Sequence, residues 1–110
     1  MRKAGIAAGW AWAAAIVWLS LTPSPPQIDI EHGDKLGHFG SYALLMFWFA
    51  QLYRVRIFYA IGFVAMGVAL ELLQGQLGYR SADVLDMGAN ALGVLLGWAA
   101  ASILPRIRMP

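Results

Sequence analysis

The 110-residue chain is too apolar for a soluble domain of its size. Hydrophobic residues make up 60% of it, charged residues 13%, and the mean hydropathy is +0.61. A small soluble domain has a large surface for its volume, and eight basic and six acidic side chains cannot cover it. The chain contains no cysteine, which excludes disulfides and thiolate metal sites. We therefore predict a membrane protein with membrane lipid as its surroundings and no nucleic-acid partner.

Four apolar segments follow one another along the chain, at about residues 4–21, 36–53, 57–73 and 84–104. Each reaches or approaches the ~20 residues that a helix needs to cross a bilayer. All must be helices, because backbone groups in lipid have no water to bond. The first segment resembles a signal peptide, but TPSPP follows it rather than a small-residue cleavage site. The predicted fold class is all-α: a polytopic four-transmembrane-helix bundle forming a single domain over residues 1–110.

The connections between these segments differ in length and chemistry. TPSPP, residues 22–26, ends the first helix, because proline lacks an amide proton and restricts the residue before it. Residues 54–56, with the sequence RVR, are a minimal turn that makes the second and third helices an antiparallel hairpin. Residues 74–79 carry two glycines and are expected to connect the third and fourth helices. Ser81 is predicted to be the N-cap of the fourth helix.

Basic residues near the helix ends predict the orientation of the bundle. In an alternating topology, six of them fall on one side: Arg2, Lys3, Arg54, Arg56, Arg106 and Arg108. Only Lys35 and Arg80 fall on the other side. Because cytoplasmic loops carry the excess of lysine and arginine, we predict that both termini and the RVR turn are cytoplasmic. Every acidic residue then lies on or near the outer side.

Polar residues recur at helical spacing in the second and third segments. Asp34, His38 and Tyr42 are four residues apart, so they share one helix face. Glu71 and Gln74 are three residues apart in the outermost turns of the third segment. Ionisable groups inside a bilayer are costly and are usually turned inward and partnered. We therefore expect these side chains to face the inside of the bundle.

The fourth segment presents a third polar face. Asp86, Asn90, Gly93 and Gly97 fall within a wedge of roughly 60° at 3.6 residues per turn. The two glycines form a small-xxx-small step that lets a neighbouring helix approach closely. The predicted topology places all three polar faces at the same height, in the outer third of the membrane, so we expect them to meet.

These residues resemble the motifs of the VanZ-like family. In chain order the motifs are Asp34-Lys35-x-x-His38-x-x-x-Tyr42, Glu71-x-x-Gln74, and Arg80-x-x-Asp83-x-x-Asp86-x-x-x-Asn90-x-x-Gly93-x-x-x-Gly97. The resemblance covers about residues 23–97, and GYR replaces a proline-containing approach to the arginine. The family consists of small bacterial integral membrane proteins, named for a member that raises resistance to the glycopeptide teicoplanin. The resemblance thus implies a multi-pass protein of the bacterial cytoplasmic membrane, in the cell envelope, but it carries no chemical mechanism.

Two function classes remain open. In the first, an outward-facing site handles a lipid-linked or anionic cell-wall ligand, or a glycopeptide-related one, and affects antibiotic susceptibility. Its ligand-binding residues would be Asp34, Lys35, His38, Tyr42, Glu71, Gln74, Arg80, Asp83, Asp86 and Asn90. If a reaction occurs, its catalytic candidates are His38, Glu71 and Asp86. In the second class, a non-enzymatic membrane subunit uses the same polar residues as interhelical structural contacts and binds a membrane-protein partner.

A metal site is a special case of the first class. Asp34 and His38 have chelating spacing, and Glu71 and Asp86 are further oxygen donors. No HExxH motif or second histidine within a span supports such a site, so the sequence predicts no metal and no cofactor.

Two pairwise contacts are predicted within the cluster. His38 and Asp86 enter the membrane from the same side at a similar depth, so we expect them to face each other. Glu71 precedes Arg80 by nine residues, and a turn at residues 75–78 would fold the arginine back over the carboxylate.

Overall fold

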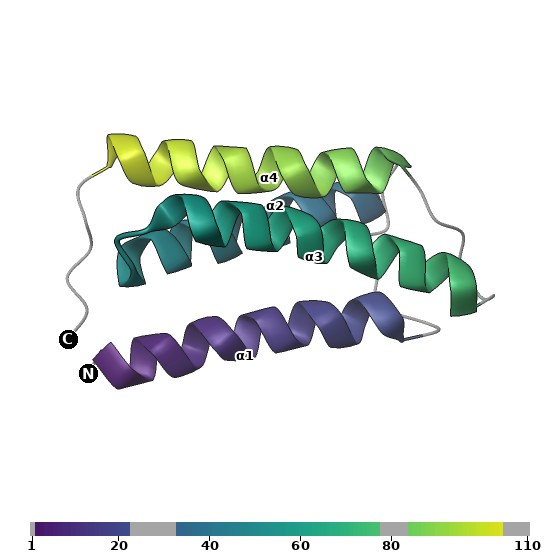
Figure 1. The fold of residues 1–110 in the computed structure, drawn as a ribbon, viewed down its shortest axis with the longest axis horizontal. Helices are drawn as coiled ribbons and strands as arrows, with labels where there is room; N and C mark the ends of the chain where they lie inside the picture. The colour runs from purple at the N-terminus through teal and green to yellow at the C-terminus, as the bar shows by residue number, and fades with distance from the viewer. Residues whose placement is uncertain (1, 23–32, 78–83, 105–110) are drawn as a thin grey trace.

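The computed structural model describes residues 2–22, 33–77 and 84–104 (Figure 1). The described residues form helices and no strand: α1 at Arg2–Leu21, α2 at Gly33–Leu52, α3 at Arg56–Leu77 and α4 at Val84–Ile103. The all-α prediction is therefore confirmed. Three of these helices are long and apolar enough to cross a membrane, over Lys3–Leu21, Arg56–Gln76 and Val84–Ile103. With this composition, the chain is a membrane protein.

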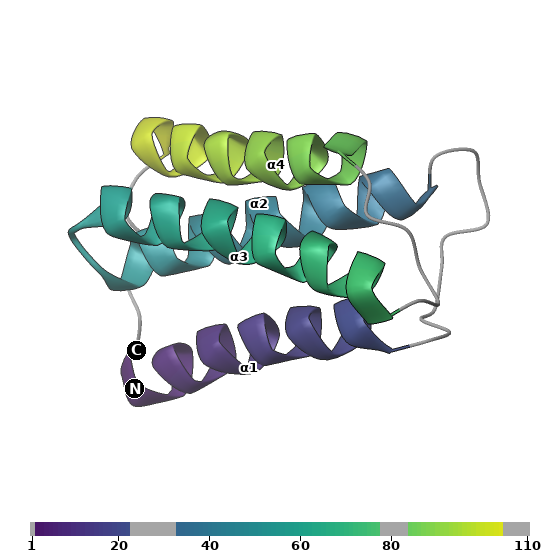
Figure 2. The same ribbon diagram turned by 45° about the vertical axis from the view of Figure 1, so that its right-hand side comes forward.

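Successive helices run antiparallel to one another and form three layers: in these views α1 lies below, α2 and α3 lie side by side in the middle, and α4 lies above (Figures 1 and 2). Helix α2 packs against all three others, whereas the described parts of α1 and α4 do not contact each other. The start of α1, the α2–α3 turn and the end of α4 lie at one end of the bundle. The opposite end, where α2 and α4 begin and α3 ends, carries the polar residues discussed below.

The most extensive helix interface, between α2 and α4, depends on two glycines. A Cβ atom on Gly93 would collide with the backbone oxygen of Phe39, and one on Gly97 with that of Ala43. Only hydrogen at these positions lets the two backbones approach so closely, because any side chain would separate them. The predicted small-xxx-small contact is confirmed, with α2 as its partner.

Two tryptophans attach α1 to α2. The Trp48 Nε1–H donates a hydrogen bond to the Gly5 carbonyl at 2.9 Å, and the Trp12 Nε1–H donates to the Ser41 carbonyl at 3.2 Å. A Cβ on Gly9 would lie 2.9 Å from Trp48 Cδ1, so this glycine makes room for the indole. The indoles bond carbonyls between helices, which suits an environment where lipid offers no other polar partner.

The α2–α3 turn is as short as predicted, but α3 is longer. The Arg56 amide donates to the Arg54 carbonyl at 3.0 Å, which closes the turn. Residues 74–77 belong to α3, so the prediction that residues 74–79 form a connector is wrong for this part. The side chain of Gln74 explains the extension: its Nε2–H donates to the Ser20 carbonyl at the end of α1. This tertiary contact offsets the weak helix propensity of Gly75.

Helix α2 also begins earlier than predicted, at Gly33 rather than Leu36, and therefore includes Asp34 and Lys35. It is not among the helices apolar enough to span by composition. Its position accounts for this: Tyr42, Leu45 and Phe49 are all 1% exposed or less, since α2 lies between its neighbours. A helix enclosed by protein needs less apolar surface than one that faces lipid.

Candidate functional site

The polar residues of three helices meet at the end of the bundle where α2 and α4 begin. His38 lies in the second turn of α2, Glu71 lies in the last two turns of α3, and Asp86 and Asn90 lie in the first two turns of α4. We call these four residues the polar cluster. Glu71 and Asn90 are each 2% exposed and Asp86 6%, so three of its members are fully buried.

His38 connects α2 to two residues of α4. Its Nδ1 lies 3.0 Å from Asn90 Oδ1, and its Nε2 lies 3.8 Å from Asp86 Oδ2. The predicted juxtaposition of His38 and Asp86 is therefore confirmed. A carbonyl oxygen only accepts hydrogen bonds, so the Asn90 contact places the proton on Nδ1. In the neutral ring, Nε2 then directs its lone pair toward the carboxylates.

Glu71 joins this pair from α3. One ligand atom each from His38, Glu71 and Asp86 can be chosen so that all lie within 4.8 Å of one another. Two carboxyl groups and an imidazole thus share one small buried volume. Such a group can hold a cation, share a proton, or pair with basic side chains, because each arrangement offsets the repulsion between the carboxylates.

Small residues position the cluster. Gly93 and Gly97 hold α4 against α2, which fixes the distance between His38 and Asp86. Gly67 in α3 has the same function for α4, since a Cβ there would lie 2.9 Å from Asn90 Nδ2. Gly67 was not among the residues predicted from the sequence. A signal was present, because Gly67 lies four residues before Glu71 and so shares its helix face.

The remaining predicted site residues fall into three groups. Tyr42 is 1% exposed and close enough to Glu71 to interact with it electrostatically, so it adjoins the polar cluster. Gln74 is buried too, but its amide bonds α1 rather than the cluster. Arg80 and Asp83 lie outside the described residues, as do the side chains of Asp34 and Lys35. The predicted pairing of Glu71 with Arg80 therefore stays a prediction. The turn predicted for it at residues 75–78 is wrong for residues 75–77, which continue α3.

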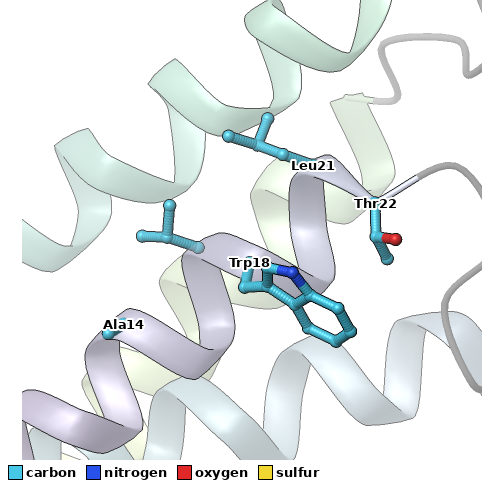
Figure 3. Close-up of a pocket in the computed structure, with 5 residues that line it drawn as sticks. Ala14, Trp18, Leu21 and Thr22 are labelled. Atoms are coloured by element: carbon cyan, nitrogen blue, oxygen red, sulfur yellow. The ribbon is translucent and has the colours of Figure 1, made fainter.

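A shallow apolar groove lies at the same end of the bundle. It has a volume of about 730 Å³ and follows the last two turns of α1 (Figure 3), where it is lined by Ala14, Val17, Trp18, Leu21 and Thr22. Gln74 joins this end of α1 to α3 one turn beyond Glu71. This hydrogen bond holds the end of α1 that carries the groove against the end of α3 that carries Glu71.

Comparison with protein families identifies the chain. A family model described as VanZ/LLP1 matches residues 5–105, which include every member of the polar cluster. No curated protein and no solved structure matches the chain.

Proposed function

The chain belongs to the VanZ/LLP1 family, and from this premise we propose that it is a bacterial cell-envelope protein whose polar cluster binds a lipid-linked or anionic cell-wall ligand. In this proposal the cluster opens to the outer leaflet of the cytoplasmic membrane. Lys35 and Arg80 supply the positive charge for the ligand, because ammonium and guanidinium groups bind phosphate and carboxylate well.

The observation that carries the proposal is the convergence of His38, Glu71 and Asp86 from three different helices. Buried ionisable groups near a bilayer are expensive, and structural contacts alone are made more cheaply by neutral side chains. Here they gather at one end of the bundle and in one volume, which is the arrangement expected of a binding site.

The proposed topology has four membrane-spanning helices, with both termini in the cytoplasm. Helix α2 crosses as well, because it packs between the three apolar helices and runs antiparallel to its sequence neighbours (Figure 2). The polar cluster lies at the end away from Lys3, Arg54 and Arg56, which is the outer end under the positive-inside rule.

Cysteines introduced singly at Ile28 and Val55 test this orientation. Position 28 should react with an impermeant reagent added from outside and position 55 should not.

The lipid part of the ligand is supported by the groove on α1. An acyl or polyprenyl chain in the outer leaflet can follow this apolar surface (Figure 3), and its head group would then reach the polar cluster. Apolar contact along a groove combined with a few polar contacts at one end is the usual form of a small-molecule site.

Mass spectrometry of the lipids and cell-wall precursors that copurify with the protein tests the proposal. The wild-type protein should carry a ligand that is lost in Glu71→Gln, whose side chain has nearly the same size. Gln51→Met is the matched control, since Gln51 is 2% exposed but lies at the other end of α2. Cells that express the same variants, grown with teicoplanin, show whether the site affects glycopeptide susceptibility. An identical lipid profile for wild type and Glu71→Gln would refute ligand binding by the cluster.

A second candidate function is a purely structural one, with a membrane-protein partner bound elsewhere. The hydrogen bonds from His38 to Asn90 and from Gln74 to Ser20 favour it, because both connect helices. The same variants separate the two functions. A structural contact loses thermal stability when Glu71 is exchanged, whereas a binding site loses its ligand and keeps its fold.

A further inference from the structure

The polar cluster has the donor atoms and the spacing of a metal site. We propose that His38 Nε2 and the carboxylates of Glu71 and Asp86 bind one divalent first-row transition-metal ion, such as Zn²⁺ or Mn²⁺. The sequence alone predicted no metal, because it has no HExxH motif and no second histidine within a span. The placement of the three donors in the fold changes that conclusion.

The first step is the distance between the donor atoms. Three donor atoms, one from each residue, lie within 4.8 Å of one another. Donors on a single zinc ion are roughly 3–4 Å apart, given metal–ligand bonds of about 2.0–2.2 Å. Small side-chain rotations are therefore enough to bring the three donor atoms within bonding distance of one ion. These three residues were among the four donors considered from the sequence; the side chain of the fourth, Asp34, lies outside the described residues.

The second step is the orientation of the histidine. Metal-bound histidines usually donate their other ring N–H to an oxygen, which fixes the tautomer and the ring plane. His38 does this through Nδ1, at 3.0 Å from Asn90 Oδ1. Its Nε2 is then the metal-binding nitrogen, on the side of Asp86 and Glu71. Asn90 is itself held in place, since it is 2% exposed and packs on Gly67.

The third step is the choice of metal. One imidazole nitrogen and two carboxylates suit Zn²⁺, Mn²⁺ or Fe²⁺, whereas Ca²⁺ and Mg²⁺ prefer shells made of oxygen alone. Three protein ligands leave a coordination position open, as in catalytic zinc sites. If the proposed function holds, a phosphate oxygen of the ligand would occupy this position. That last statement rests on the proposed function, whereas the metal site itself does not.

Metal binding by the purified, chelator-treated full chain tests the site. Titration calorimetry with Zn²⁺ should show one equivalent bound per chain, and Co²⁺ should give visible absorption bands from a nitrogen- and oxygen-ligated ion. His38→Gln, Glu71→Gln and Asp86→Asn should each weaken Zn²⁺ binding by at least about 100-fold, because each removes a ligand. Asn90→Ala should weaken it by about 10- to 100-fold, the range for partners of ligands.

His32→Gln is the matched control, because it removes the other histidine of the chain, which lies outside the described residues. It should bind Zn²⁺ like the wild type. Zn²⁺ should also raise the Tm of the wild type and of His32→Gln but not that of Glu71→Gln, since binding to the folded state alone stabilises it. Should the ligand variants fail to fold, pulsed EPR on Mn²⁺-loaded wild type still decides the matter, by showing or lacking a coupled histidine nitrogen.

Two results would overturn the site. One is a wild-type chain that takes up no Zn²⁺ or Mn²⁺, as expected if Arg80 or Lys35 neutralises the carboxylates instead. The other is Zn²⁺ binding that Glu71→Gln and Asp86→Asn leave unchanged. Copurification of the cell-wall ligand is measured separately, with and without chelator. Ligand bound in chelator without metal refutes the metal-bridged contact while leaving the proposed function intact.

Discussion

The two ends of the bundle are built by opposite means. At the α2–α3 turn, Phe49 packs edge-on against Trp10 and Phe63, with ring centroids 5.1 and 5.0 Å away, and Tyr53 stacks on Tyr59 at 4.7 Å. At the other end the polar cluster brings two carboxyl groups and an imidazole into one buried volume.

This difference separates stability from function within one small bundle. Lipid is as apolar as a protein core, so the hydrophobic effect adds little at the aromatic end. This end is stabilised by close van der Waals packing instead. The polar cluster contributes less to stability, because burying ionisable groups costs free energy even when they are paired. Substitutions at the aromatic end should therefore reduce stability, and those in the polar cluster should reduce binding.

The largest expected effect is that of Phe49→Ala. Phe49 is fully buried and contacts four aromatic rings, so its removal leaves a cavity between three helices. We expect a loss of about 3 kcal/mol, the low end of the range for buried phenylalanine, because lipid supplies no hydrophobic drive. Thermal unfolding in detergent measures it. Phe58→Ala is the control, since Phe58 is 72% exposed and should change stability little. Equal effects of the two exchanges would contradict the packing argument.

A smaller loss, of about 1–3 kcal/mol, is expected for Gly93→Ala. The new Cβ would meet the Phe39 backbone, which cannot rotate away, so α4 must shift from α2. Because that shift also separates Asp86 from His38, this variant should lose ligand and Zn²⁺ binding as well as stability. Gly93→Ala should therefore affect both the stability of the bundle and binding by the polar cluster.

Gly88→Ala is the matched control on the same helix. Nothing lies within 4 Å of a Cβ at this position, so the exchange should be neutral or should stabilise the helix by up to about 1 kcal/mol. If Gly93→Ala were equally neutral, the close approach of α2 and α4 would be wrong.

The sequence predicted the polar end better than the aromatic end. The positions of Asp86, Asn90, Gly93 and Gly97 on one helix face follow from spacing alone, and the structure confirms that this face meets α2. Polar residues are rare in apolar helices, so each one carries information about where the helix faces. The aromatic contacts of Phe49 were not predictable, because most of its neighbours in α2 are apolar and its partners come from two other helices.

Tertiary contacts also explain a helix end that the spacing of residues in the sequence did not predict. Gln74 and Gly75 have the composition of a loop, and only the hydrogen bond from Gln74 to Ser20 shows why α3 continues to Leu77. Glu71 was recognised from its isolation in an apolar segment. Its distance to His38 and Asp86 depended on Gly67 and Gly93, whose packing partners no spacing rule identifies.

The alternative to the metal site is the predicted pair of Glu71 and Arg80, which should show as an energetic coupling between these two residues in the metal-free protein. If the arginine folds back over the carboxylate, removing one charge leaves the other without its partner, so each single exchange costs more than the pair. A double-mutant cycle of Glu71→Gln and Arg80→Gln should give a coupling of about 0.5–3 kcal/mol in thermal stability. Strictly additive effects would exclude the pair and leave Lys35 as the partner to test.

The smallest expected effect concerns the attachment of α1. Trp48→Phe removes the Nε1–H that donates to the Gly5 carbonyl at 2.9 Å but keeps most of the aromatic surface. The loss should be about 0.5–1.5 kcal/mol, the net value of one hydrogen bond, and somewhat more if the carbonyl is left without water. Trp18→Phe is the control, because Trp18 is 66% exposed and lines the groove rather than a helix contact.

Both tryptophan variants also separate stability from binding. Trp48→Phe lowers the Tm but leaves the polar cluster untouched, so Zn²⁺ and ligand binding by the folded protein should stay at wild-type values. Trp18→Phe should show the reverse pattern, with an unchanged Tm and weaker retention of the lipid part of the ligand, since it reduces the apolar surface of the groove. If Trp48→Phe instead abolished binding at an unchanged Tm, α1 would belong to the site itself, and the division of the bundle into a stabilising end and a binding end would fail.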